Sequence, residues 1–153
     1  MIKICLSLGS NIEPEKNLKA ACVLLEKQLG PLIISSIYVT EDEVYQTHTL
    51  YSNLSVVAET HLSLDELIDQ VLHPIERQLG RTITEHKTNQ KIIDIDVSYY
   101  GDEPVETVTD YFYRLAPLAE IAPEFIDLGS QKTLSELLLN FKKIKYKLYA
   151  YRT

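Results

Sequence analysis

The spacing of apolar residues changes several times along this chain of 153 residues, and the order of the changes restricts the fold. Four short segments alternate apolar residues or are rich in β-branched and aromatic ones, which predicts strands over residues 3–8, 32–40, 53–60 and 92–100. Between them, apolar residues recur every three to four positions, which predicts helices over residues 14–29 and 63–79.

The resulting order, β-α-β-β-α-β, predicts a ferredoxin-like α/β sandwich of the α+β class. Additional C-terminal helices are expected around residues 115–125 and 134–141, and Thr133 with Glu136 forms a capping box for the second. The tail, in which lysines alternate with apolar residues, is either a last strand or a basic surface segment. Because no linker or repeat interrupts the chain, we expect a single domain over residues 1–153.

Two aspartates stand one residue apart in the fourth expected strand, "KIIDIDVSYYG". Because side chains alternate along a strand, Asp94 and Asp96 share one face, and their Cα atoms are about 6.5–7 Å apart. The carboxylates can then hold one hard cation or bridge two. Without a cation, like charges on one face disfavour the fold. A half-exposed strand that has two aspartates on its wet face is the alternative, and the pair alone favours neither.

Cations flank this pair in the sequence. Arg81 follows the second expected helix and Lys91 opens the strand, and the loop between them contains His86 and Lys87. Phosphoryl transfer uses metals to bridge phosphates and cations to stabilise developing charge, so the combination indicates a phosphate site. For His86 and Lys87, a solvated surface loop is at least as good an explanation.

Two further stretches place polar groups at strand ends. In "LSLGSN", Gly9 permits a tight turn after the first strand, and Ser10 and Asn11 follow it. In "TLYSNLSVV", Asn53 can read the edge of a heterocycle, because its amide both donates and accepts hydrogen bonds. For both stretches an ordinary turn is the commoner explanation.

Composition excludes several classes of function. A net charge of -7 argues against a nucleic-acid binder, which needs a basic surface. Cys5 and Cys22 match no metal or redox spacing, and two reduced, buried thiols are the favoured interpretation. Neither a signal peptide nor a run of membrane-spanning length is evident. We therefore expect a cytoplasmic protein with small-molecule partners.

Taken in order, six stretches resemble the 6-hydroxymethyl-7,8-dihydropterin pyrophosphokinase family of folate biosynthesis. They are "LSLGSN", "SSIYVT", "YSNLSVVAET", "IERQLGR", "KIIDIDVSYYG" and "PLAEIAPEF", and together they span nearly the whole chain. The resemblance implies ATP-dependent transfer of pyrophosphate to a pterin hydroxymethyl group with release of AMP. It also implies two Mg²⁺ ions bound with ATP, and a monomer is expected.

On the nucleotide side, the resemblance implies that Asp94 and Asp96 bind the metals. It also implies that Arg81 and Lys91 act on the phosphates, and that Glu76 lies near the nucleotide. Lys91 stands where the family typically has an arginine, and a lysine cannot form the bidentate contact that an arginine makes with phosphate.

On the pterin side, the resemblance implies that Thr40, Tyr51 and Asn53 form the substrate pocket. Tyr113 matches the position of an aromatic residue that stacks on the pterin ring from the other face.

The chain also departs from the family pattern. It has no Trp, and residues 102–118 are shorter than in the family and contain no histidine, with Arg114 as their only cation. These departures leave two alternatives open. One is a catalytically weak or inactive pterin- or nucleotide-binding protein of the same fold. The other is a regulatory or interaction module in which the aspartates are merely exposed to water.

Overall fold

The computed structural model describes residues 1–81, 90–141 and 143–151. Its main sheet has seven strands in the order β6-β5-β1-β4-β3-β9, with β2 also paired to β4, and every pair is antiparallel. The strands are β1 (Ile2–Ser10), β2 (Ile33–Ile34), β3 (Ile37–Glu41), β4 (Leu50–Thr60), β5 (Asp94–Tyr100), β6 (Glu103–Pro104) and β9 (Lys147–Tyr149). The central order β5-β1-β4-β3 is that of the ferredoxin-like fold, which confirms the predicted fold class.

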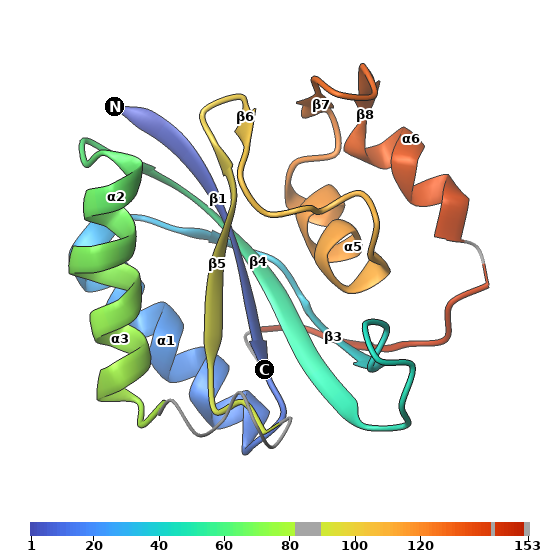
Figure 1. The fold of residues 1–153 in the computed structure, drawn as a ribbon, viewed down its shortest axis with the longest axis horizontal. Coiled ribbons are helices and arrows are strands. Elements are labelled where there is room, and N and C mark those ends of the chain that lie inside the picture. Colours follow the sequence, from blue (N-terminus) through green and yellow to red (C-terminus); the bar gives the residue numbers. More distant parts are fainter. Residues whose placement is uncertain (82–89, 142, 152–153) are drawn as a thin grey trace.

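Helices cover both faces of this sheet (Figure 1). One face carries α1 (Pro14–Leu29) and a continuous helical segment made of α2 (Leu64–Leu67), η1 (Ile68–Leu72) and α3 (His73–Gln78). The other face carries α5 (Phe112–Ile121), followed by α6 (Leu134–Leu138) and η2 (Leu139–Phe141). A small second sheet pairs β7 (Ile126–Asp127) with β8 (Lys132–Thr133).

The alternation along β1 explains why two helical layers are needed. Ile4, Leu6 and Leu8 are fully buried in the core beneath α1 and α3. Cys5 points to the opposite face and belongs to the core that Leu115 of α5 completes. Because both faces of β1 are buried, apolar residues occur at most positions of its sequence.

On the α5 face, polarity changes from one cross-strand row to the next. Cys5 pairs with Val57 and Tyr99, and all three are buried apolar side chains. Two residues further along β1, Ser7 pairs with Ser55 and Asp96, and Gly9 then pairs with Asn53 and Asp94. The polar rows lie beyond the apolar core of this face, so this end of the sheet is where a site can form.

Several local predictions are confirmed, and several need correction. The capping boxes of Ser63 and Thr133 are both present, and the tail contributes strand β9. The strand expected over residues 32–40 is two strands, because Ser35 and Ser36 interrupt it. The second helix has a π-helical middle, and the helix expected around residues 115–125 begins earlier, at Phe112.

The fourth strand begins at Asp94, later than predicted, and a bulge near its end changes which residues face α5. Pairing shifts between Cys5 and Leu6 of β1, opposite Val97 and Tyr99. Tyr99 therefore joins the core on the α5 face, the face of the aspartates, whereas simple alternation would place it on the other face.

Both cysteines are buried free thiols, as predicted. Among the described residues, no helix has the length and apolar character needed to cross a bilayer.

Candidate active site

A cavity of about 240 Å³ lies over the polar rows of the sheet. Side chains from β1, β4, β5, α5 and the loop between β3 and β4 line it. The lining residues are Ser7, Gly9, Thr40, Glu41, Asp42, Glu43, Val44, Tyr45, Tyr51, Asn53, Lys91, Asp94, Asp96, Tyr113 and Arg114. Phenol rings and carboxylates therefore share one compartment.

Gly9 provides space for an amide in the cavity. It lies within β1, so the predicted turn at this position is wrong, and its role follows from a close approach. A Cβ on Gly9 would lie 2.6 Å from Oδ1 of Asn53, a distance that real side chains do not adopt. Asn53 is 4% exposed, and its Nδ2 has no hydrogen-bond partner among the residues that the structure describes. The amide thus presents an unpaired donor at the wall of the cavity.

The end of α3 explains the position of Arg81. Gly80 has a φ of 103°, in the left-handed region that glycine adopts readily. The Gly80 N–H donates to the Arg77 carbonyl and the Arg81 N–H donates to the Glu76 carbonyl, both at 3.0 Å. This pair of bonds is a Schellman motif, and it turns the chain back so that Arg81 lies beside Glu76.

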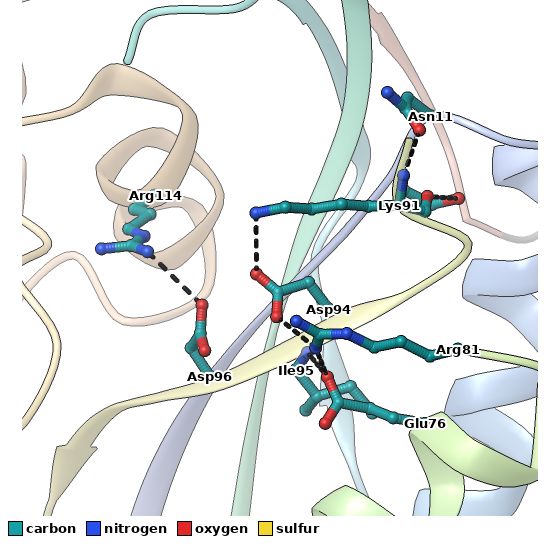
Figure 2. A network of polar contacts seen from close by, with 9 residues as sticks. Asn11, Glu76, Arg81, Lys91, Asp94, Ile95, Asp96 and Arg114 are labelled. Atoms are coloured by element: carbon teal, nitrogen blue, oxygen red, sulfur yellow. Dashed lines mark hydrogen bonds and ion pairs between the residues drawn. The ribbon is translucent and has the colours of Figure 1, made fainter. Parts of the chain in front are cut away.

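Glu76 ties this helix end to β5 (Figure 2). Its carboxylate is buried, accepts the Ile95 N–H at 3.0 Å and pairs with the Arg81 guanidinium. Burial raises the pKa of Glu76, against the lowering effects of the Ile95 N–H and Arg81. Arg81 in turn donates to Oδ1 of Asp94 at 2.7 Å. Glu76 therefore orients Arg81, and through it the first aspartate.

Lys91 reaches Asp94 from the other side. Its backbone is held by Asn11, whose Oδ1 accepts the Lys91 N–H at 2.7 Å and whose N–H donates to the Lys91 carbonyl at 2.9 Å. Its Nζ lies 3.6 Å from Oδ2 of Asp94. Burial alone would raise the pKa of Asp94, but Lys91 and Arg81 together hold it below its usual value. Asp94 is therefore a carboxylate at neutral pH.

Asp96 has a cationic partner of its own, Arg114 of α5, at 3.4 Å. The same guanidinium donates to the Thr107 carbonyl at 2.9 Å. It also lies 6.0 Å from the ring centre of Tyr111 and 5.4 Å from that of Tyr113. Burial and the neighbouring charge of Asp94 raise the pKa of Asp96, against the lowering effect of Arg114.

The loop between β3 and β4 covers part of the cavity and is fixed at two points. Asp42 accepts the N–H groups of Val44 and Tyr45 at 3.0 and 3.1 Å, which shapes the loop. Glu43 accepts the N–H groups of Phe112 and Tyr113 at 3.0 and 2.8 Å. Since α5 has no side-chain cap of its own at its N-terminus, Glu43 serves as the cap from a distant loop.

Most residues singled out from the sequence meet in this cavity. The lining includes Thr40, Tyr51, Asn53, Lys91, Asp94, Asp96 and Tyr113. Glu76 and Arg81 lie behind Asp94 and are not among the lining residues. His86 and Lys87 lie outside the described residues.

Sequence reasoning gave no role to Arg114 or Glu43. Arg114 offered a signal, because it is the only cation between residues 102 and 118. Glu43 offered none, since its partners lie 69 and 70 positions away along the chain.

The donor set of the cavity fits Mg²⁺ rather than zinc. Among the described residues, no group of three metal-binding side chains is present, and Asp94 and Asp96 stand as a pair. Mg²⁺ typically takes one or two carboxylates and completes its octahedron with waters and substrate phosphates. The two aspartates on one strand face therefore suit a metal that arrives with a phosphorylated ligand.

Comparison with known proteins gives a consistent result. The family model for 7,8-dihydro-6-hydroxymethylpterin-pyrophosphokinase matches residues 5–123. A 2-amino-4-hydroxy-6-hydroxymethyldihydropteridine pyrophosphokinase of Methylorubrum extorquens is 32% identical over 150 residues, covering 90% of this chain and 92% of that protein. An enzyme of the same name from Synechocystis is 37% identical over 97 residues, covering 58% of this chain and 49% of that protein.

Other relatives are longer than this chain. A folate synthesis bifunctional protein of Chlamydia caviae is 30% identical over 136 residues, covering 78% of this chain. The chain spans only 30% of that protein, and about half of the Synechocystis one. Among solved structures, an HPPK-DHPS protein of Plasmodium falciparum matches with a TM-score of 0.70 and 16% identity. That match covers 92% of this chain and 44% of the other, and it supports the fold.

Proposed function

The chain belongs to the 7,8-dihydro-6-hydroxymethylpterin-pyrophosphokinase family, and on that premise we propose that it transfers pyrophosphate from ATP to 6-hydroxymethyl-7,8-dihydropterin. In this reaction the hydroxymethyl oxygen attacks the β-phosphorus and AMP leaves. The observation that carries the proposal is a single cavity in which the aspartate pair of β5 lies beside the phenol rings of Tyr51 and Tyr113 and the buried amide of Asn53.

On the phosphate side, Asp94 and Asp96 would hold Mg²⁺. A bound metal would neutralise charge that develops on the phosphates. Arg81 and Lys91 both lie against Asp94, so they are placed to stabilise the group in transfer. Glu76 contributes by orienting Arg81 and not by contacting the nucleotide.

On the pterin side, Tyr51 and Tyr113 offer flat apolar faces with polar tips, which suits stacking on a heterocycle. Burial raises the pKa of Tyr113 to about 12, so its hydroxyl stays protonated. Asn53 and Thr40, both buried at the cavity wall, supply hydrogen bonds to the ring edge.

The decisive experiment measures pterin-dependent AMP formation from ATP and Mg²⁺ in the wild type, D94N and D96N. We expect each variant to lose about a hundredfold or more of the rate, since each removes a carboxylate that would hold the metal and so weakens stabilisation of the developing phosphate charge. Pterin affinity, measured by calorimetry, should change little. The exposed Asp102 provides the control, and D102N should keep wild-type turnover. Full activity in D94N or D96N would contradict the metal assignment.

A second candidate is a binding protein of the same fold with weak or no transfer activity. It is favoured by one observation, that Asp94 and Asp96 already have three cationic partners from the chain itself. The same assay separates the two. Pterin binding without pterin-dependent AMP would select the binding protein.

We also propose that the chain functions as a single-domain, cytoplasmic monomer. The two buried free thiols suit a reducing compartment. Light scattering after size-exclusion chromatography tests the oligomeric state. A dimer mass at working concentration would contradict it.

A further inference from the structure

Four ion pairs join acidic and basic side chains of the site among the described residues. Glu76 and Asp94 pair with Arg81 and Lys91, and Asp96 pairs separately with Arg114. A divalent cation that entered alone would meet two aspartates that already have cationic partners. Metal binding therefore requires either that a cation leaves its carboxylate or that anions arrive with the metal.

Arg114 is the one cation paired with Asp96 among the described residues, whereas Asp94 has two cationic partners. Its single contact with Asp96 is 3.4 Å long, whereas Arg81 donates to Asp94 at 2.7 Å and is also paired with Glu76. Other contacts hold the Arg114 side chain in place, namely the Thr107 carbonyl at 2.9 Å and the ring of Tyr113. The guanidinium can leave Asp96 without losing its position beside the cavity.

The surroundings determine what a released Arg114 needs. Its side chain is only 16% exposed, and an unpaired buried charge is strongly unfavourable. Arg114 and Asp96 both line the cavity, so an anion bound there can replace the carboxylate. A guanidinium fork matches two oxygens of a phosphate better than a single carboxylate oxygen at 3.4 Å.

We propose that Arg114 is a displaceable counter-ion. It neutralises Asp96 until a divalent cation takes that carboxylate, and its guanidinium then binds anionic oxygens of the nucleotide phosphates. The second half of this inference rests on the proposed nucleotide site. It makes Arg114 the residue that couples metal binding to triphosphate binding, because metal without phosphate leaves Arg114 unpaired.

The test is whether removing the guanidinium changes the affinity for metal alone and the affinity for metal with nucleotide in opposite directions. Calorimetry measures the affinity of wild type and R114M for Mn²⁺ alone, and for Mn²⁺ with α,β-methylene-ATP. We expect R114M to bind Mn²⁺ alone about tenfold more tightly, and the Mn²⁺–nucleotide complex about tenfold more weakly. An arginine that only supports the fold would shift both affinities in the same direction, and that result, or no shift, would overturn the proposal.

Two controls keep the test independent of folding and of general electrostatics. R114K retains the charge and should bind Mn²⁺ alone as the wild type does, which separates charge at Asp96 from an altered fold. Should R114M not fold, R114Q takes its place, and the Arg114 Nε–H resonance of the wild type provides a direct readout by NMR. The proposal requires that resonance to shift when Mg²⁺ and nucleotide are added together. An unchanged resonance would contradict it.

The two proposals fail separately. If the wild type forms no pterin-dependent AMP, the proposed reaction is contradicted. Opposite changes in the two Mn²⁺ affinities of R114M would still support the role of Arg114 in a nucleotide-binding protein. If AMP forms and the shifts have the same sign, the reaction stands and Arg114 has only a structural role.

Discussion

At the scale of single residues, Asn53 shows how a buried group can reveal a ligand. Its Nδ2 lacks a partner within the described part of the chain, so a pterin acceptor would satisfy it on binding. We expect N53A to weaken pterin binding by about 1–3 kcal/mol, the range for loss of a hydrogen bond to a buried group. The melting temperature should hardly change, because the lost donor had no partner within the folded protein.

Ser55 is the matched control for this prediction. Its hydroxyl is also buried and unpaired, but the residue does not line the cavity. S55A should therefore leave pterin affinity, measured by the same calorimetry, at the wild-type value. Equal losses of affinity in N53A and S55A would show that the effect arises from the sheet and not from ligand contact.

Glu76 carries a second residue-scale prediction, which separates positioning from contact. In E76Q the amide keeps the shape of the side chain but removes the charge that balances Arg81. Arg81 keeps its bond to Asp94, but Arg81 and the Ile95 N–H both lose a charged acceptor, so we expect a loss of about 2 kcal/mol in the free energy of unfolding. Turnover should also fall, while pterin affinity stays unchanged. Urea denaturation and the AMP assay measure these effects, and E124Q, at an exposed position, is the control. Unchanged stability of E76Q would contradict the role given to Glu76.

At the scale of elements, helix α5 depends on a loop that is remote in sequence. Burial raises the pKa of Glu43, although the N–H groups of Tyr113 and Phe112 lower it. The folded protein thus holds this proton more tightly than the unfolded chain does. The contribution of Glu43 to the free energy of unfolding is then largest in acid and declines as pH rises from the ordinary value of 4.5 through the raised pKa.

The measurement compares urea unfolding of wild type and E43Q across the acidic range. The free energy of unfolding of the wild type minus that of E43Q should decrease as pH rises. E59Q changes an exposed position on β4, so its free energy of unfolding should differ from that of the wild type by the same amount at every pH. A difference that grows with pH would mean that the two backbone N–H groups outweigh burial at Glu43.

Elements with strong local signals were predictable, and their exceptions have physical causes. Helix α1 extends from Pro14 to Leu29, as its apolar spacing and Gly30 predicted. The bulge near Tyr99 was not predictable, because it depends on pairing between β1 and β5 and leaves no mark in the composition of either strand. The π-helical turn η1 was not predictable either, because the apolar spacing on either side of it is that of an ordinary α-helix.

At the scale of the whole molecule, sequence reasoning located the cavity better than it located the contacts within it. Asn53 and Asp94 could be selected from their positions in the expected strands, and Tyr51 from the family resemblance, and the fold brings all three together. The pairing of Asp96 with Arg114 could not, because it depends on where α5 crosses the sheet. Such interlayer contacts follow from the packing of both faces and not from any local pattern.

The last described segment joins two layers of the molecule, and this gives a final prediction. Strand β9 pairs with β3, and just before it Tyr146 lies 5.6 Å from the ring centre of Tyr38 and 5.0 Å from that of Phe112. Phe112 opens α5, so Tyr146 supports the helix that carries Tyr113 and Arg114. We expect Y146A to lose about 1–2 kcal/mol in the free energy of unfolding, since aromatic pairs contribute beyond their buried area.

The control for Y146A is another tyrosine that the structure leaves in solvent. Tyr45 is 71% exposed, so Y45A should unfold in urea at the wild-type midpoint. Pterin affinity provides the second readout, because support of α5 by Tyr146 implies that Y146A also weakens stacking on Tyr113. If Y146A lost stability but bound pterin as the wild type does, Tyr146 would stabilise the sheet without supporting α5. Because Tyr113 lines the cavity and follows Phe112 at the start of α5, we expect Y146A to lose both stability and pterin affinity.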